Sequence, residues 1–299
     1  MKNHRVWLIT GSSRGFGRHI AEEVLRRGER LVATARAPEH LQSLIDQYGE
    51  SVQAAAVDVT RPADIQAAVA LAVKTFGRLD VLVNNAGYGF TGAFEEMSAD
   101  AFQKQIDTNF WGVIHACRAA VPLMRKQGFG HIIQISSVGG RAAFPGLSAY
   151  HAAKFAVEGF SETLAQELAP LGIRVTIVEP GGFRTDWAGA SMGYAVPLAA
   201  YDQTVGAMRD YMKEHADEMP GDPRKAAAII CDLLNMPEPP LRLPLGNDAL
   251  VLLRNAYHTS LEALEQWRDL TKSTDRDGLV TSDTDHAVLH IRPHHSSMV

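Results

Sequence analysis

The sequence predicts an α/β fold: a single, doubly wound parallel sheet of about seven strands with helices on both faces. Short apolar runs rich in Val, Ile and Leu recur along the chain, and each is followed by a longer segment with helical spacing of its apolar residues. Parallel strands covered on both faces have such continuous apolar runs. With 299 residues, of which 46% are hydrophobic, the chain is long enough to bury the core of one large domain.

The elements follow in order. After the first strand, Phe16, Ile20 and Val24 recur four residues apart and form one apolar stripe, and Gly28 is the expected end of that helix. Six strands are expected at Arg5–Thr10, Arg30–Ala35, Val52–Val57, Leu79–Val83, His131–Ile135 and Arg174–Val178. A seventh, Leu241–Leu245, is expected at an edge, where Pro244 is tolerated. Long helices are expected at 98–126, 148–169 and 247–270.

Two segments depart from this pattern. The segment from Trp187 to Pro220 is rich in aromatic residues and Met, which is typical either of a substrate lid or of ordinary core. The tail from Ser273 to Val299 is polar and lacks apolar periodicity, and we expect it to be flexible. The expected organisation is therefore a catalytic domain over 1–272, with a lid at about 187–220, and a flexible tail over 273–299.

The composition favours a small-molecule enzyme of the cytoplasm. A net charge of −5, from 34 acidic and 29 basic residues, gives no basic field for nucleic acid or anionic lipid. The two cysteines, Cys117 and Cys231, form no Cys-x-x-Cys pair, which fits a reducing compartment and offers no thiolate metal site. Four histidines of the tail are typical either of fortuitous metal binding or of a flexible tail, and we favour the flexible tail and expect no metal centre: His286, His290, His294 and His295. No apolar stretch approaches the roughly 18 residues that span a bilayer.

A glycine-rich turn joins the first strand to the first helix. Gly11, Gly15 and Gly17 have the spacing Gly-x-x-x-Gly-x-Gly, which differs from the commoner Gly-x-Gly-x-x-Gly. Such glycines let backbone amides approach a pyrophosphate, which the N-terminus of the helix attracts. A plain tight turn is the alternative, but the position of the three glycines directly after the first strand favours a Rossmann-type dinucleotide site. The contacts expected here are Gly11, Ser13, Arg14, Gly15, Phe16 and Gly17.

A second pattern, Tyr150-His151-Ala152-Ala153-Lys154, places Tyr150 and Lys154 four residues apart on one helix face, and Ser137 precedes them at the end of a buried strand. The ordinary pKa of a phenol, near 10, must fall by about three units for proton exchange at neutral pH. A neighbouring ammonium and a cationic nicotinamide would favour that fall, and a Ser hydroxyl would stabilise charge on the reacting oxygen. Alone, the Tyr–Lys pair is also typical of a helix surface.

Together these motifs make the chain similar to the short-chain dehydrogenase/reductase family over residues 5 to 250. Further motifs of that family follow in order: Asn84-Asn85-Ala86-Gly87, Asn109-Phe110-Trp111-Gly112, Ser136-Ser137 and Pro180-Gly181. The resemblance implies a catalytic tetrad of Asn109, Ser137, Tyr150 and Lys154, with Asn109 holding a water that links Lys154 to solvent. It also implies cofactor contacts at Asp58, Val59, Asn85, Ala86, Gly87, Tyr150, Lys154, Pro180, Gly181, Phe183 and Thr185. Outside this set, Asn109 would be a buried polar group at a helix kink and Asp58 a strand-end cap.

Charge favours NADP(H) over NAD(H). A carboxylate at the end of the second strand would accept bonds from a ribose 2′-hydroxyl, but the sequence there is Ala33-Thr34-Ala35-Arg36. Arg14 and Arg36 are both placed to meet a 2′-phosphate, although either is also typical of a solvated surface.

The sequence therefore predicts an oxidoreductase, a carbonyl reductase or alcohol dehydrogenase, acting as a homodimer or homotetramer. The segment from Asn85 to Met97 and the lid resemble the family branch that handles hydroxysteroids and retinoids, which implies a bulky apolar substrate. A cofactor-sensing regulatory protein on the same fold is the alternative, but it would not need the tetrad. An epimerase or dehydratase is disfavoured because little chain remains after Leu245 for a substrate domain.

Overall fold

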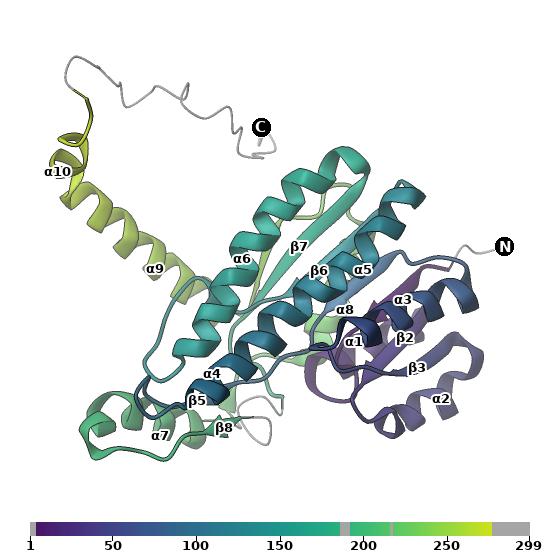
Figure 1. Cartoon of the computed structure of the whole chain (residues 1–299), viewed down its shortest axis with the longest axis horizontal. Coiled ribbons are helices and arrows are strands. Elements are labelled where there is room, and N and C mark those ends of the chain that lie inside the picture. The colour runs from purple at the N-terminus through teal and green to yellow at the C-terminus, as the bar shows by residue number, and fades with distance from the viewer. Residues whose placement is uncertain (1–3, 186–191, 216–217, 277–299) are drawn as a thin grey trace. The chain divides into compact units, whose positions relative to one another are not determined.

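The computed structural model describes residues 4–185, 192–215 and 218–276, and it divides into two compact units, Met1–Ala256 and Tyr257–Val299. The first unit contains a seven-stranded sheet with the order β3-β2-β1-β4-β6-β7-β9, in which all neighbouring strands are parallel (Figure 1). Its strands are β1 Val6–Ile9, β2 Arg30–Ala35, β3 Val52–Ala56, β4 Val81–Asn84, β6 Gly130–Ile135, β7 Ile173–Pro180 and β9 Arg242–Leu245. The predicted seven-stranded doubly wound sheet is confirmed, with Pro244 on the edge strand β9.

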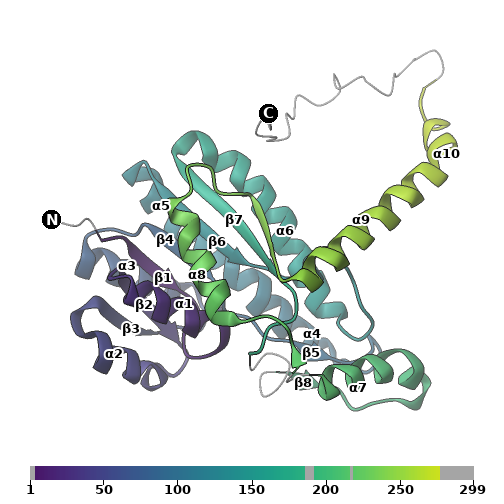
Figure 2. The same ribbon diagram turned by 180° about the vertical axis from the view of Figure 1, so that it is seen from behind.

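Helices cover both faces of this sheet, as predicted. One core joins α3, α5 and α6 to the sheet, and a second core joins α1, α2 and α8 to the other face. Figure 1 looks onto the face covered by α5 and α6, and Figure 2 onto the face covered by α8. The helices are α1 Gly15–Arg26, α2 Gln42–Tyr48, α3 Pro62–Phe76, α4 Ala99–Ile106, α5 Gly112–Gln127, α6 Ser148–Leu168, α7 Ala207–Glu214, α8 Pro223–Asp232, α9 Asn247–Gln266 and α10 Arg268–Lys272.

Strand β1 shows why the sheet needs cover on both faces. Val6 and Leu8 belong to the core beneath α3, α5 and α6, whereas Trp7 and Ile9 belong to the core beneath α1, α2 and α8. Successive side chains of a strand point to opposite faces, so a continuous apolar run supplies both cores at once.

Two of the predicted long helices are interrupted. The helix expected over 98–126 is divided into α4 and α5 by a π-turn at Asp107–Trp111. Its Asn109 side chain bonds to the backbone of Tyr88, which periodicity alone does not reveal. The helix expected over 247–270 is divided into α9 and α10 at Trp267, which has φ −101° and ψ 11°. The helices expected to end at Gly28 and near Gly172 do so, and both glycines have positive φ.

Two short strands were not expected. β5, Phe90–Thr91, pairs in parallel with β8, Gly193–Tyr194, as a separate two-stranded sheet. This pairing brings the segment that begins at Met192 next to the segment that follows β4. Trp187, the first residue of the predicted lid, and residues 277–299 of the predicted tail lie outside the described residues.

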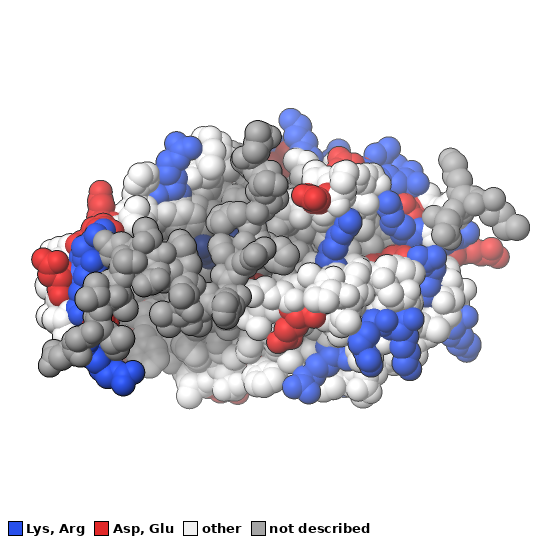
Figure 3. Space-filling view, turned by 90° about the horizontal axis from the view of Figure 1, so that it is seen from above, with Lys and Arg blue, Asp and Glu red and all other residues white. Residues whose placement is uncertain are grey.

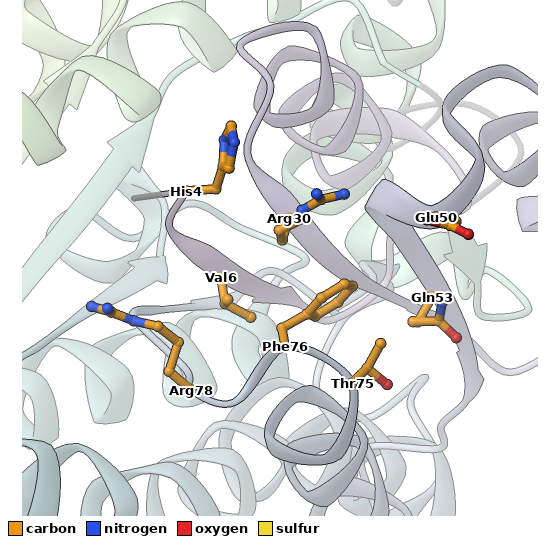
Figure 4. A pocket seen from close by; sticks show the side chains of 8 residues that line it. All are labelled: His4, Val6, Arg30, Glu50, Gln53, Thr75, Phe76 and Arg78. Carbon is orange, nitrogen blue, oxygen red and sulfur yellow. The ribbon is translucent and has the colours of Figure 1, made fainter. Parts of the chain in front are cut away.

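Because the strands are parallel, their carboxyl ends share one edge of the sheet, and the glycine turn lies at that edge. An open hollow of about 510 Å³ lies at the other edge, beside the amino ends of β1 and β2, with His4, Arg30 and Arg78 among its lining residues (Figure 4). No residue of the predicted site lines that hollow. The site is therefore expected at the carboxyl ends of the strands, where ligands of open α/β sheets bind.

The surface seen in Figure 3 carries Lys and Arg side chains in small groups with Asp and Glu side chains among them. Within the described residues, no helix combines the length and the hydropathy needed to cross a bilayer.

Candidate active site

The glycine turn after β1 has a backbone that only glycines accommodate easily. Gly11 has φ 69° and Gly15 has φ 57°, in the left-handed region. At Gly17 a Cβ atom would lie 2.2 Å from the carbonyl oxygen of Gly11, so no larger residue fits there without moving the turn. Gly11, Gly15 and Gly17 therefore make a compact cradle at the start of α1, with Ser13 and Arg14 between them.

Asn85, which follows β4, holds this turn in place. Its side-chain amide donates to the carbonyl oxygens of Thr10 and Gly11, at 2.9 and 3.0 Å. In return the Thr10 hydroxyl accepts hydrogen bonds from the backbone amides of Asn85 and Ala86, both at 3.0 Å. The two predicted motifs, far apart in the sequence, are thus bonded to each other at the edge of the sheet.

The N-terminus of α1 fits an anionic group. Arg14, the N-cap residue, is extended and makes no side-chain capping bond, so its side chain does not occupy the first amides of α1. Free amides and the positive end of the helix dipole together attract phosphate. The cradle of Gly11, Gly15 and Gly17 leaves no Cβ atoms in the approach, and this observation fits a pyrophosphate.

Arg36 and Asp58 lie near each other beyond the ends of β2 and β3. The Asp58 carboxylate accepts bonds from the backbone amide and the hydroxyl of Thr60, at 3.0 and 2.7 Å. Burial opposes the ionisation of Asp58, but the Thr60 bonds and the charges of Arg61 and Arg36 outweigh it and lower the pKa of this carboxyl. Arg14 and Arg36 are both exposed, so their charges are available to a ligand. Val59, next in the chain, is buried against Gly112.

The loop after β7 lies against the glycine turn. The Phe183 ring meets the Phe16 ring edge-on, with 4.9 Å between centroids, and Thr185 lies 3.8 Å from where a Gly15 Cβ would be. At the start of this loop, Gly181 donates to the carbonyl of Leu245. Pro180, Gly181, Phe183 and Thr185 were expected near the cofactor, and the structure brings Phe183 and Thr185 next to the predicted pyrophosphate cradle.

Asp248 holds the same loop and was missed by sequence reasoning. Its carboxylate accepts a 2.6 Å hydrogen bond from the amide of Gly182, and a Cβ at Gly181 would lie 2.3 Å from the same carboxylate. An Asp in the first turn of a helix is usually only a favourable charge at the helix N-terminus. Its second partner, a glycine after β7, is distant in sequence, and no local pattern indicates it.

Tyr150 and Lys154 lie one turn apart on α6 and are both buried. The Lys154 ammonium donates a 2.8 Å bond to the carbonyl of Ile135, at the end of β6, and lies 5.8 Å from the centre of the Tyr150 ring. Ser137, two residues after Ile135, hydrogen-bonds through its side chain with Tyr150 and also accepts a 3.0 Å bond from the Gly139 amide. The structure therefore brings Ser137, Tyr150 and Lys154 together, as the pattern predicted.

The pKa values of these groups reflect their burial. Burial raises the pKa of Tyr150 to about 12, and the bond with Ser137 opposes that rise only in part. Burial lowers the pKa of Lys154 to about 8, against the favourable charge of Glu158. Burial thus shifts the pKa of the Tyr150 phenol away from the value near neutrality that is expected from the sequence. The fall in pKa that the sequence predicts for Tyr150 takes no account of burial, which disfavours the charged phenolate.

Asn109 lies in the π-turn between α4 and α5, and it is almost fully buried. Its side-chain amide donates a 2.8 Å hydrogen bond to the carbonyl oxygen of Tyr88, and its side-chain oxygen accepts a 3.0 Å hydrogen bond from the Tyr88 backbone amide. A Cβ at Gly87 would lie 3.1 Å from the same Asn109 oxygen. Asn109 therefore fixes the chain that leaves Gly87. It does so from within a π-turn, a feature often found at functional sites.

His151 was not singled out, yet it shapes the wall beside Tyr150. Its Nδ1 lies 2.7 Å from the carbonyl oxygen of Gly139, and its Nε2 accepts a 2.9 Å hydrogen bond from the backbone amide of Phe144. Burial lowers the pKa of His151, so the neutral ring with a proton on Nδ1 satisfies both bonds. It connects the turn after Ser137 to the chain before α6 and is not free for proton transfer.

The longest described part of the predicted lid, 192–215, packs on the segment after β4. The Thr91 hydroxyl lies 3.3 Å from the sulfur of Met192, and the Leu198 amide donates 2.7 Å to Glu96. Tyr194 is half-buried beneath the ammonium of Lys213, which lies 4.7 Å from the centre of its ring. Among the described residues, no group of three or more His, Cys, Asp or Glu side chains is arranged to hold a metal ion.

The chain is similar to one family model and to several known proteins. The family model described as short chain dehydrogenase matches residues 5–192. Oxidoreductase BOA17 of Botryotinia fuckeliana is 45% identical over 89% of this chain and 98% of its own length. The 3-ketodihydrosphingosine reductase of Bacteroides thetaiotaomicron is 37% identical over 81% of this chain and 88% of its own.

Solved structures agree with this fold. A short-chain dehydrogenase from Streptomyces avermitilis is 40% identical, with a TM-score of 0.87 over 92% of this chain and 100% of that one. Two more distant structures have TM-scores of 0.69: a 3-ketoacyl-(acyl-carrier-protein) reductase from Brucella melitensis with NADH, 26% identical over 82% and 98% of the two chains, and ElxO with NADP, 28% identical over 83% and 99%. Of these two similar structures, one therefore contains NADH and the other contains NADP.

Proposed function

The chain belongs to the short-chain dehydrogenase/reductase family, and from that membership we propose that it moves a hydride between NADP(H) and the carbonyl or secondary alcohol carbon of a bulky apolar substrate. One observation carries the proposal: buried Tyr150 is hydrogen-bonded to Ser137 and lies one helical turn from the buried ammonium of Lys154. A phenol between a hydroxyl and an ammonium suits proton transfer to an oxygen on which charge develops.

NADP(H), when bound, supplies or accepts the hydride. The chain's own residues bind the cofactor, orient the substrate and move the proton. Gly11, Gly15 and Gly17 with the first amides of α1 would hold the pyrophosphate, and Lys154 would bond the nicotinamide ribose. In reduction, the Tyr150 phenol donates its proton to the substrate oxygen while the Ser137 hydroxyl stabilises that oxygen. In oxidation, the Tyr150 phenolate takes the proton back. We assign the backbone at Asn109 to the water that connects Lys154 with solvent.

Two charges support NADP(H) over NAD(H). Arg14, in the glycine turn, and Arg36, directly after β2, are both exposed, and Arg36 is close enough to Asp58 to lower the pKa of its carboxyl. Guanidinium groups suit the dianionic 2′-phosphate, and no carboxylate ends β2, where Ala35 stands. Asp58, bonded to Thr60, would then face the adenine rather than the ribose.

The apolar lid supports a bulky apolar substrate. Met192, Val205 and Met212 are buried in the segment 192–215, which packs beside Phe90 and Thr91. The relative named 3-ketodihydrosphingosine reductase, 37% identical, supports a large apolar ketone. We also propose a cytoplasmic homodimer or homotetramer, since both thiols are free and Trp111 and Phe155 expose 44% and 46% of their surface.

The experiment is a screen of NADPH and NADH consumption against small and bulky ketones and aldehydes, with the matching alcohols in the reverse direction. Turnover of bulky ketones with NADPH that disappears in Tyr150→Phe supports the proposal. Cofactor binding without turnover of any member of the panel would instead favour the regulatory protein. A preference for NADH would overturn the cofactor assignment.

A further inference from the structure

A buried cluster of charged residues lies beyond Lys154 on α6. Glu158 is one turn after Lys154, and Glu179 is the last residue but one of β7; they expose 3% and 1% of their surface. Carboxylates are almost never so fully buried unless they are paired. The proposed proton transfer from Tyr150 uses neither of them.

Two arginines hold these carboxyl groups close together. The Arg242 Nε atom of β9 lies 3.3 Å from Glu158 and 3.5 Å from Glu179. The Arg141 Nη1 atom, just after the turn that begins at Ser137, lies 3.6 Å from Glu179 and 4.0 Å from Glu158. Arg242 also bonds Glu162, which is half-exposed one turn further along α6. The cluster thus extends from the surface to the turn below Ser137.

Two oxygens of the pair accept no hydrogen bond, although Arg242 and Arg141 approach Glu179 Oε1 as ion pairs at 3.5 and 3.6 Å. Glu158 Oε1 and Glu179 Oε1 are fully buried, and neither has a hydrogen-bond partner among the described residues. Two carboxylates that face each other cannot bond, whereas a carboxylic acid and a carboxylate can. A single proton on the pair therefore satisfies what the arginines leave unsatisfied. Burial and the charge of Glu158 raise the pKa of Glu179 to about 7, against Arg141 and Arg242, which agrees with one retained proton.

The pair is close enough to affect the proposed site. A Cβ at Gly140 would lie 2.9 Å from the Ser136 hydroxyl and 3.1 Å from Glu158 Oε1, so Glu158 lies directly under the turn that carries Ser137. Glu158 also favours the charged form of Lys154, whose burial disfavours it. The remaining titratable and charged groups that face this region are Tyr150, His151 and Glu162 from α6, Arg141 from the turn, Glu179 from β7 and Arg242 from β9.

We propose that Glu158 and Glu179 share one proton and that Glu158, through this pair, sets the charge of Lys154. Glu158 is then a positioning residue of the reaction proposed above, on which its catalytic meaning rests. Loss of Glu158 leaves the remaining charge on Glu179, on a different element, and Lys154 releases its proton more easily. Loss of Glu179 leaves a full charge on Glu158, on the same helix face as Lys154, and Lys154 holds its proton more tightly.

The test measures the charge of Lys154 directly, by NMR titration of lysine labelled with ¹³C at Cε, with Lys154→Arg to assign the resonance. Wild type should titrate near 8. Glu158→Gln should lower that midpoint by about one pH unit, tenfold in proton affinity, and Glu179→Gln should raise it. The matched control is Glu162→Gln, which removes a half-exposed carboxylate from the same arginine and should leave the midpoint in place. An unchanged midpoint in folded Glu158→Gln, or shifts of the same sign in both variants, overturns the proposal.

A second measurement uses the wild type and does not depend on a variant that folds. With ¹³C-labelled glutamate carboxyl groups, one carboxyl of the pair should stay protonated until about pH 7. If both are ionised at pH 5, the shared proton is disproved. Since neither titration needs turnover, an inactive protein that shows these shifts would disprove the proposed function and leave the inference standing. In an active protein, the midpoint shift of Glu158→Gln should reappear in the pH profile of kcat/KM.

Discussion

The ammonium of Lys154 donates a 2.8 Å hydrogen bond to the carbonyl oxygen of Ile135, at the end of β6. A long side chain is thereby fixed to the sheet before any cofactor is present. Ser137, two residues further along the chain, is hydrogen-bonded to Tyr150, so Ser137 and Lys154 depend on the same strand end. Fixed groups of this kind need little reorganisation during reaction.

Tyr150→Phe should abolish proton transfer while leaving the fold and the cofactor site intact. General acid–base groups contribute about 10²- to 10⁴-fold to the rate, so kcat should fall by at least 10²-fold. The Kd of NADPH, from fluorescence titration, should change little. The matched control is Tyr48→Phe, which removes a phenol hydroxyl bonded to Gln47 at the end of α2 and should keep wild-type turnover. A Tyr150→Phe enzyme that retains a tenth of wild-type kcat would contradict the assignment.

The buried carboxyl of Glu179 predicts a particular pH dependence of stability. Its pKa is raised from 4.5 to about 7 in the folded protein, so its contribution to stability is complete below pH 4.5 and is lost as pH rises through 7. Glu179→Gln lacks this loss. The Tm of the variant minus that of wild type should therefore increase between pH 4.5 and 7 and level off above, by roughly 2–4 °C for each kcal/mol removed. A difference that stays flat across this window would show that Glu179 is ionised throughout.

Cofactor preference should respond to the charges near the expected adenosine ribose. Ala35→Asp combined with Arg36→Ser places a carboxylate at the end of β2 and removes a guanidinium, so the ratio of kcat/KM for NADPH to that for NADH should fall. Contacts to charged groups contribute about 1.5–3 kcal/mol each, which corresponds to at least tenfold in that ratio. Arg125→Gln, an exposed arginine in the last turn of α5, is the control and should leave the ratio unchanged.

The large parts of the fold could be predicted because their signals are local. Buried parallel strands need apolar runs, and β1 illustrates this by supplying both cores from four consecutive residues, Val6 to Ile9. Gly11, Gly15 and Gly17 were predictable for a similar reason, since a backbone with positive φ or with a carbonyl 2.2 Å from a Cβ position restricts the residue directly.

The rest depends on partners that are distant in the chain. Glu158 has the sequence signature of a solvated helix residue, and its burial is explained by Arg242, 84 positions away, together with Arg141. The π-turn at Asn109 depends on the backbone of Tyr88, 21 positions earlier. The short strands β5 and β8 are stabilised by each other across the chain, and two residues are too few for a periodic pattern.

The lid assignment predicts a substrate-dependent effect at Tyr194. This side chain is half-buried in the segment beside Thr91. Tyr194→Ala should raise KM for bulky ketones more than for small ones, because apolar area buried against the substrate is worth about 25 cal/mol per Å². The same is expected of Trp187→Ala. Tyr257→Ala is the control, since that ring lies outside the lid and is 44% exposed, and it should change neither KM. Equal losses for small and bulky ketones would argue against a lid.

The tail predicts a truncation that keeps the enzyme intact. The compact unit with the sheet and all the proposed site residues ends at Ala256, and α10 ends at Lys272. The sequence after Lys272 is polar and lacks apolar spacing, so its removal should expose no core. A chain ending at Lys272 should therefore keep its Tm within a few degrees and its kcat within about twofold. We would measure both beside the full chain at equal subunit concentration, with light scattering for the oligomeric state. A large loss of Tm or kcat would mean that the tail docks, either on its own subunit or on a second copy, and a change of molecular mass would identify the second copy.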